Sequence, residues 1–162
     1  MIRAFWSKIV SQAKQAILLV EDDSNDVLLV QRAFRLAQFG GSIKIVSDGE
    51  EAVSYLSRQP PYENRELHPF PLLLLLDLKL PRRSGLEVLE WLRQQPELKR
   101  LLVVVLTASR ESLDVKKAYD LGVNSYLVKP VLFEDLVILM NNLGTYWFKL
   151  NENPEVFNGW NS

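Results

Sequence analysis

Five short, mainly apolar runs constrain the fold of this chain more than any other feature. Runs that are continuous, rather than alternating with polar residues, are typical of strands covered by helices on both faces, as in a parallel sheet. Each run is far shorter than the roughly 20 apolar residues that a membrane-spanning helix needs. We therefore expect five buried parallel strands and no transmembrane segment. The expected strands are residues 17–20, 43–46, 72–76, 101–106 and 125–128.

Helical patterns fill the gaps between these runs. Ser24 or Asn25 can cap the first helix, which reaches about Phe39, where the pair Gly40-Gly41 stops it. Strand and helix therefore alternate five times, and right-handed crossovers fold such a chain into an α/β domain with a doubly wound five-stranded parallel sheet. The other expected helices run from Asp48 to Pro60-Pro61, from Gly85 to about Pro96, from about Glu111 to Leu121 and from Pro130 to near Trp147.

Polar residues of a particular kind follow four of the five runs. They are Glu21 and Asp22 after the first run, Asp77 after the third, Thr107 after the fourth and Lys129 after the fifth. Because parallel strands all point the same way, the residues just past them lie on one edge of the sheet, where open sheets bind ligands. Three carboxylates, one hydroxyl and one ammonium group are thus expected to meet there.

Asp77 is the expected acceptor of a phosphoryl group. A carboxylate is already anionic at neutral pH, so it can attack a reactive phosphoryl group without a general base. The phosphoryl group and the neighbouring carboxylates repel one another, and a Mg²⁺ ion held by one or two carboxylates is the ordinary solution. Lys129 would bring a compact positive charge to the phosphoryl oxygens, and Thr107 would donate its hydroxyl to one of them.

Four segments at these strand ends match the motifs of a known family: Val20–Asp23, Leu76–Pro81 with Gly85, Leu106–Ala108 and Val128–Pro130. Over about residues 16–146 the chain resembles the receiver domains of two-component response regulators, and among them the stand-alone regulators that pair with bacterial phytochromes. The resemblance implies a flavodoxin-like sheet with strand order 2-1-3-4-5. It also implies a phosphoryl donor: a sensor histidine kinase, with a bacterial phytochrome as one candidate.

The resemblance assigns the metal ligands. It implies Asp22 and Asp77 as direct ligands of Mg²⁺, the backbone carbonyl of Lys79 as a third ligand, and Glu21 as a partner through water. Two residues depart from the common pattern. Glu21 stands where many relatives have Asp, and Lys79 places a second ammonium group beside the acceptor.

The resemblance also implies a switch. Thr107 shifts toward the phosphoryl group, the aromatic ring of Tyr126 follows, and the small Ala108 leaves the phosphoryl pocket open. These shifts remodel one face of the domain, through which we expect phosphorylation-dependent binding and homodimerisation. That face consists of the helix at about 111–121, the strand at 125–128 and the helix that Pro130 opens.

The expected receiver domain, residues 16–147, has an extension at each end. Residues 148–162 form an aromatic tail that includes Phe157 and Trp160; it is too short for an output domain and is expected to extend the dimer face. Residues 1–15 are expected to form an amphipathic helix that packs on the domain or binds a partner or membrane surface, unless it is disordered. Its apolar residues are Ile2, Phe5, Trp6, Ile9, Val10 and Ala13.

Each site residue also has a plainer interpretation. Asp22 or Asp23 alone could cap a helix, Thr107 could bond local backbone, and Lys129 before a proline could belong to a solvated turn. Their joint occurrence at four strand ends favours the receiver. A flavodoxin-like cofactor carrier is disfavoured because the acidic segment after the first strand would repel the cofactor phosphate. A phosphatase with an aspartyl nucleophile normally has a second acid where this chain has Lys79, so we expect no enzyme.

Composition narrows the function further. The 162 residues suffice for one domain. With 19 basic and 20 acidic residues the net charge is −1, so the chain lacks the excess of positive charge that is typical of nucleic-acid-binding proteins. The sequence has no cysteine and no evident secretory signal, so we expect a cytoplasmic protein. The single histidine, His68, is expected to be solvated in a long Pro-rich loop, residues 57–71, which is itself expected to be functional or mobile.

Overall fold

A single parallel sheet of five strands organises the structure, a computed structural model that describes residues 15–38 and 40–154. The strand order is β2-β1-β3-β4-β5, and neighbouring strands pair in parallel throughout. The expected doubly wound sheet and its strand order are therefore confirmed. The strands are β1 Ala16–Val20, β2 Ser42–Val46, β3 Leu73–Leu76, β4 Leu102–Thr107 and β5 Ser125–Val128.

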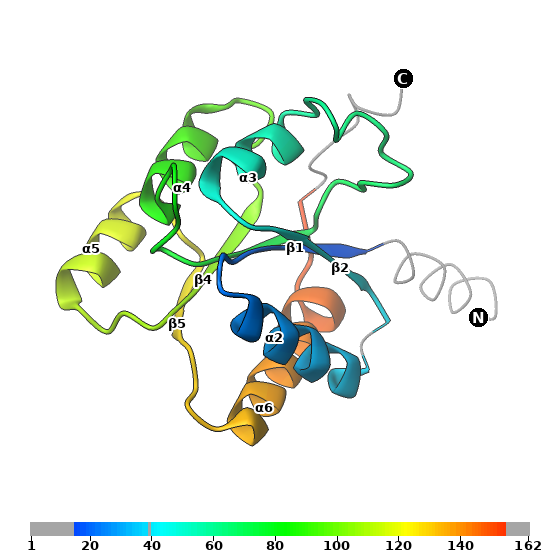
Figure 1. Ribbon diagram of the computed structural model, residues 1–162, viewed down its shortest axis with the longest axis vertical. Coiled ribbons are helices and arrows are strands. Elements are labelled where there is room, and N and C mark those ends of the chain that lie inside the picture. The colour runs from blue at the N-terminus through cyan, green and yellow to red at the C-terminus, as the bar shows by residue number, and fades with distance from the viewer. Residues whose placement is uncertain (1–14, 39, 155–162) are drawn as a thin grey trace.

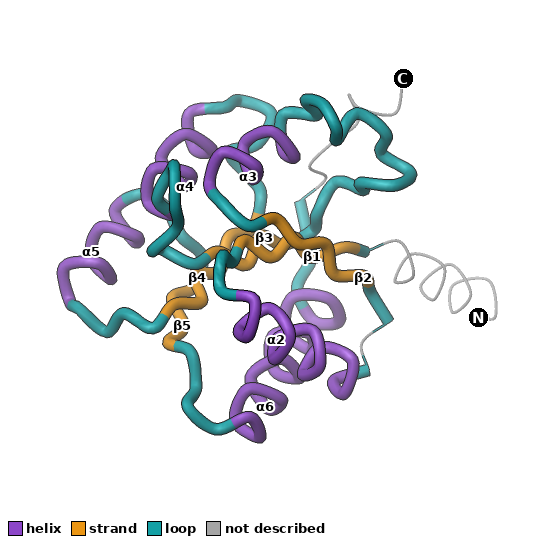
Figure 2. Tube along the Cα trace, viewed as in Figure 1, coloured by secondary structure: helices purple, strands orange, loops and turns teal. Residues whose placement is uncertain are grey.

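Five helices cover the two faces of this sheet (Figures 1 and 2). The helices α2 Ser24–Ala37 and α6 Phe133–Gly144 pack together on one face. The other face carries α3 Gly49–Leu56, α4 Gly85–Gln94 and α5 Ser112–Asp120. Each β1 residue is buried because successive side chains of a strand point to opposite faces, and both faces are covered. This arrangement explains why the apolar runs are continuous.

Two apolar cores result, one on each side of the sheet. Ile17 and Leu19 of β1 belong to the core under α2 and α6, while Leu18 and Val20 belong to the other core. The first core also contains Val30, Ala33, Phe34, Leu73, Leu75, Val104, Leu136, Met140 and Leu143. The second also contains Ala52, Tyr55, Leu74, Leu76, Val88, Leu89, Leu92, Val103, Val105 and Ala118.

The boundaries of α2 differ slightly from the prediction. Asp23, not Ser24 or Asn25, is the N-cap, because its carboxylate accepts hydrogen bonds from the Asn25 and Asp26 amides at 2.9 Å each. A carboxylate at this position also interacts favourably with the helix dipole. The helix ends at Ala37, where Gln38 adopts a left-handed conformation with φ of 53°.

The last helical segment is longer and more irregular than predicted. Instead of ending near Trp147, α6 ends at Gly144 and continues as a π-helical segment, η1 Thr145–Leu150. Phe148 in η1 is only 6% exposed and packs in the core under α2 and α6, so it is not an exposed tail aromatic. The predicted N-terminal helix, Phe157 and Trp160 lie outside the described residues.

The loop between α3 and β3 is tied to the domain by several contacts. The Tyr55 hydroxyl donates to the Pro69 carbonyl at 2.8 Å, and Arg65 donates to the carbonyls of Leu56 and His68 at 3.3 and 3.2 Å. The prediction that His68 is solvated is wrong. Its ring is half-buried and meets the rings of Tyr62 and Tyr55 edge-on at centroid distances of 5.1 and 5.9 Å.

Within residues 15–38 and 40–154, no helix combines the length and the apolar character that a membrane crossing requires.

Candidate metal and phosphoryl-acceptor site

The carboxyl ends of four strands bring the predicted residues together. Glu21, Asp77 and Lys129 directly follow β1, β3 and β5, and Thr107 is the last residue of β4. Backbone hydrogen bonds extend the sheet past these ends: the Asp77 amide donates to Val20 at 3.1 Å, and the Lys129 amide donates to Thr107 at 2.8 Å. The sheet therefore fixes where these side chains start, and they share one edge as predicted.

Three carboxylates at this edge fit a divalent cation. Glu21, Asp22 and Asp77 each offer one oxygen, and these oxygens lie within 4.8 Å of one another. Glu21 and Asp77 are 3% and 7% exposed, whereas Asp22 is open to solvent. Mg²⁺ prefers oxygen ligands and keeps several of its waters, so a trio with one solvent-facing member suits it. The donor set of the acidic trio thus fits a divalent-metal site.

Lys129 holds this acidic edge together. Its ammonium group donates to Glu21 at 2.6 Å, to Asp26 at 2.8 Å and to Asp77 at 3.0 Å. A lysine ammonium has three hydrogens, so all of its donors have an acceptor. Asp26 was not among the site residues predicted from the sequence. Its position three residues after the α2 N-cap, which places it on the first turn beside the sheet edge, is the signal that could have revealed it.

Burial and ion pairing shift the protonation equilibria of this cluster. Burial raises the pKa of Glu21 to about 7, and the negative charge of Asp77 adds to the rise, while hydrogen bonds from Lys129 and the Asp23 amide oppose it. Burial acts to lower the pKa of Lys129, but its hydrogen bonds to Asp26, Glu21 and Asp77 outweigh burial, and the pKa is raised. Lys129 therefore remains an ammonium ion at neutral pH.

Asp77 is held from both sides. One carboxylate oxygen accepts the Leu78 amide at 2.7 Å, and the other accepts Lys129. The side chain of Lys79, two residues further on, is exposed. The role of the Lys79 carbonyl as a metal ligand stays a prediction.

The predicted switch residues lie on or directly after β4 and β5, the two strands that follow β3 in the sheet order. Thr107 is buried, and its hydroxyl accepts the Ser109 amide in a long 3.4 Å hydrogen bond, while Ala108 is exposed. The Tyr126 hydroxyl donates to the Ser109 carbonyl at 3.0 Å, and the Ser109 hydroxyl donates to Asp114 at 2.6 Å. Ser109 therefore links Thr107, Tyr126 and α5. No motif in the sequence indicated this role for Ser109, because it depends on how the loop after β4 turns.

Known proteins share this fold and are similar to this chain in sequence. The profile of the response regulator receiver domain matches residues 17–141. Response regulator Rcp1 of Synechocystis sp. is 40% identical over 139 residues, which cover 86% of this chain and 92% of Rcp1.

Two crystal structures are similar as well. The phosphorylated cyanobacterial phytochrome response regulator RcpA is 36% identical with a TM-score of 0.80, over 86% of this chain and 98% of that chain. The Mn²⁺-bound form of Rcp1 is 39% identical with a TM-score of 0.77, over 86% of this chain and 99% of that chain. Sequence, fold and the geometry of the acidic edge agree, and the chain belongs to the response regulator receiver domain family.

Proposed function

We propose that this protein accepts a phosphoryl group on Asp77 from a sensor histidine kinase and signals through phosphorylation-dependent protein binding. The observation that carries the proposal is the position of Asp77: it belongs to the metal-binding trio and also contacts Lys129 at 3.0 Å. A nucleophile, the carboxylates for a cation and a fixed ammonium group therefore meet at one point. Catalysis of phosphoryl transfer consists mainly of such positioning and charge stabilisation.

The transfer is a displacement at phosphorus. A carboxylate oxygen of Asp77 forms a bond to phosphorus while the bond between phosphorus and the donor histidine breaks, and the electron pair of that bond leaves with the imidazole nitrogen. Lys129 and the Thr107 hydroxyl stabilise the phosphoryl oxygens, and the exposed Ala108 leaves room for the incoming group. The carboxylates of Asp22 and Asp77, with Glu21 and the Lys79 carbonyl nearby, would hold a Mg²⁺ ion, which would offset the negative charge of the phosphoryl group.

Apolar residues beside the acceptor suit a docking kinase. Leu28 and Leu29 on α2 are exposed, and Val131 and Leu132 between β5 and α6 are 95% and 60% exposed. Leu29 lines a hollow of about 40 Å³ together with Lys129. The resemblance to the phytochrome response regulator RcpA supports a phytochrome as the kinase.

Substitution of Val131 separates docking from chemistry. Val131→Asp should reduce phosphotransfer from the kinase, because it places a charge in the proposed docking surface. It should leave phosphorylation by acetyl phosphate unchanged, because Val131 lies outside the metal trio and the Lys129 contacts. Equal transfer from the kinase to the variant and the wild type would contradict this docking surface.

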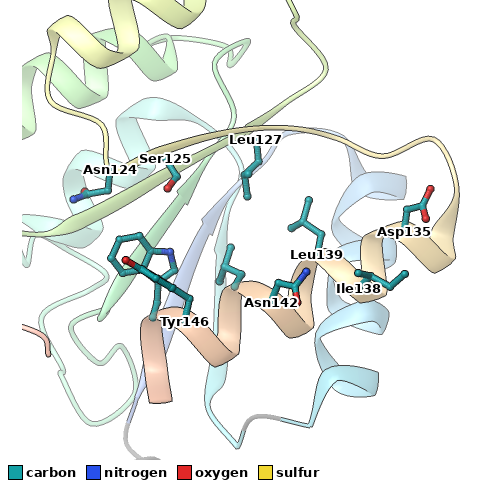
Figure 3. Close-up of a pocket in the computed structure, with 10 residues that line it drawn as sticks. Asn124, Ser125, Leu127, Asp135, Ile138, Leu139, Asn142 and Tyr146 are labelled. Atoms are coloured by element: carbon teal, nitrogen blue, oxygen red, sulfur yellow. The ribbon is translucent and has the colours of Figure 1, made fainter. Parts of the chain in front are cut away.

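Output would come from homodimerisation through α5, β5 and α6, extended by the tail, rather than from catalysis or nucleic-acid binding. Tyr119, Ile138 and Tyr146 are more than half exposed on this face. A groove of about 540 Å³ lies between β5 and α6, with Leu127, Leu139 and Tyr146 among its walls (Figure 3). Exposed apolar surface of this kind marks protein interfaces, and a two-fold dimer is the commonest closed assembly. We place this exchange in the cytoplasm, together with the kinase.

The acceptor is tested by intact-mass measurement after incubation with acetyl phosphate and Mg²⁺. The wild type should gain one phosphoryl group, and Asp77→Asn should gain none. Asp120→Asn, which removes an exposed carboxylate at the end of α5, is the matched control and should behave as the wild type does. A phosphoryl group on Asp77→Asn with the same lability to base would rule out Asp77 as the acceptor.

The dimer is tested by sedimentation with and without a phosphoryl analogue. Ile138→Asp should weaken association at least tenfold, because it places a carboxylate on the proposed interface. Leu36→Asp changes an equally exposed leucine on α2 and should leave association unchanged. A chain that ends at Pro154 keeps Phe148 in the core and tests the tail alone. A wild type that stays monomeric at high micromolar concentration in both states would contradict the dimer.

A further inference from the structure

Asp26 is the one acceptor of the Lys129 ammonium that lies outside the acidic trio. Its carboxylate is 2.8 Å from the Lys129 nitrogen, a distance between those of Glu21 and Asp77. The Asp26 side chain is 37% exposed, whereas that of Lys129 is 17% exposed. Asp26 therefore holds Lys129 from the solvent side of the cluster, while Glu21 and Asp77 hold it from inside.

Both partners of this contact stand on fixed backbone. The Asp26 amide donates to the Asp23 carboxylate at 2.9 Å, which secures the first turn of α2, and α2 packs along α6. The Lys129 amide donates to the Thr107 carbonyl at 2.8 Å. The contact between Asp26 and Lys129 thus joins the start of α2 to the end of the sheet, across 103 positions of sequence.

A bound cation changes the balance among the three acceptors. Glu21 and Asp77 belong to the trio that fits the cation. A cation bound there would offset their negative charge and repel the nearby Lys129 ammonium group. Asp26 is not a member of the trio. It is therefore the carboxylate whose attraction for Lys129 persists when the metal site is filled.

We propose that Asp26 is a positioning residue: it keeps the Lys129 ammonium beside Asp77 when metal and phosphoryl group occupy the site. The inference deepens the proposed function and rests on it. A lysine side chain has many rotamers. The contact with Asp26 restricts them in advance, so Lys129 loses less conformational entropy when it contacts the phosphoryl group. By positioning Lys129, Asp26 should strengthen binding of the phosphoryl group. By its negative charge alone, Asp26 should weaken that binding, because a carboxylate repels an anionic ligand. The two effects have opposite signs.

The first experiment observes the Lys129 ammonium group directly by proton–nitrogen NMR in the absence of metal. In the wild type the signal should be sharp, because three acceptors slow its exchange with water. It should broaden or vanish in Asp26→Asn and persist in Asp26→Glu, which restores a carboxylate. An unchanged signal in Asp26→Asn would overturn the inference, and Asp26→Ser provides the same reading if the Asn variant does not fold.

The second experiment titrates the proteins with beryllofluoride, a phosphoryl analogue, at saturating Mg²⁺. Asp26→Asn should bind three- to tenfold more weakly than the wild type, and Asp26→Glu should recover most of the affinity. Glu134→Gln, which removes an exposed carboxylate from the first turn of α6, is the charge-matched control and should bind normally. Equal or tighter binding by Asp26→Asn would overturn the inference.

These outcomes separate the inference from the proposed function. If the wild type itself fails to bind beryllofluoride, the proposed function fails, and the ammonium signal still decides whether Asp26 holds Lys129. If the wild type binds and Asp26→Asn binds equally well, only the inference about Asp26 fails.

Discussion

Gly85 lies directly against the backbone of Asp77. A β-carbon at Gly85 would stand 2.1 Å from the Asp77 carbonyl oxygen and 2.7 Å from the Cα atom of Leu78. The Gly85 amide in turn donates to the Leu78 carbonyl at 2.9 Å. Gly85, the first residue of α4, therefore supports the backbone of the proposed acceptor. No larger residue fits at this position unless the start of α4 or the backbone at Asp77 shifts.

Gly85→Ala should impair phosphorylation as well as stability. The added methyl group has no space, so either Asp77 or the start of α4 must move, with a loss of about 1–3 kcal/mol in the free energy of unfolding. Urea unfolding and the rate of phosphorylation by acetyl phosphate measure the two effects.

Gly40→Ala is the control for this prediction. Gly40 has φ of 71° and open space around its β-carbon position, so alanine strains the backbone far from the site. This variant should lose stability but be phosphorylated by acetyl phosphate at a normal rate. A normal phosphorylation rate for Gly85→Ala as well would show that the contact between Gly85 and Asp77 does not position Asp77.

Asp22→Asn should weaken Mg²⁺ binding tenfold or more, because it removes the solvent-facing carboxylate of the trio. The fold should be unaffected, because Asp22 is exposed. Calorimetric titration with Mg²⁺ measures the change. Asp23→Asn alters the neighbouring acid, which caps α2 and stands outside the trio, and should bind Mg²⁺ almost normally. Removal of the metal with EDTA should stop phosphorylation of the wild type.

Lys79→Ala should shorten the lifetime of the phosphorylated protein. The Lys79 side chain is exposed two residues beyond the acceptor, where it can shield the phosphoryl group from an attacking water. Its removal should speed hydrolysis several-fold, on the order of 1 kcal/mol in the barrier. Decay in kinase-free buffer with excess Mg²⁺ measures the rate. Unchanged decay would indicate that Lys79 is uninvolved, and slower decay would indicate that it assists hydrolysis; either result would contradict shielding.

Tyr55→Phe should destabilise the loop between α3 and β3 and change the response to alkaline pH. At neutral pH the loss of the hydrogen bond to Pro69 should cost about 1 kcal/mol. Burial raises the pKa of Tyr55 to about 12, with a smaller rise from Tyr62 and an opposing effect of Arg65.

The pKa of an unfolded tyrosine is about 10, so the unfolded chain ionises first. The contribution of neutral Tyr55 is therefore complete below pH of about 10 and is lost as the pH rises toward 12. Between pH 8 and pH 11, urea unfolding should show a larger loss in the free energy of unfolding for the wild type than for Tyr55→Phe. Equal losses would show that ionisation of Tyr55 does not cause the loss of stability at alkaline pH.

The sequence predicts the strand ends well, and the reason is local. Asp77 and Thr107 directly follow or end buried apolar runs, and a parallel sheet brings such positions to one edge whatever the rest of the chain does. The position of Asp26 on the first turn of α2 could have placed it near the sheet edge, but its contact with Lys129 also depends on the rotational phase of α2 relative to the sheet.

The positions of Phe148 and His68 have a related cause. Phe148 is buried because η1 turns it under α2 and α6, and His68 is half-buried because the loop folds back onto Tyr55 and Tyr62. Contacts between segments far apart in sequence decide both positions, and neither apolar periodicity nor residue type reports them.

The burial of Phe148 has a practical consequence. A β-carbon on Gly41, just before β2, would lie 3.8 Å from the Phe148 ring and 2.8 Å from the carbonyl oxygen of Gln15. Asn153 in turn donates to the Trp147 carbonyl at 3.2 Å. Gln15 and the segment around Asn153 thus both lie toward the amino-terminal edge of the sheet. The five residues of β1 separate that edge from the acidic trio, about 16 Å at 3.3 Å per residue. A dye or surface tether joined on that side leaves the approach of a kinase to Asp77 open.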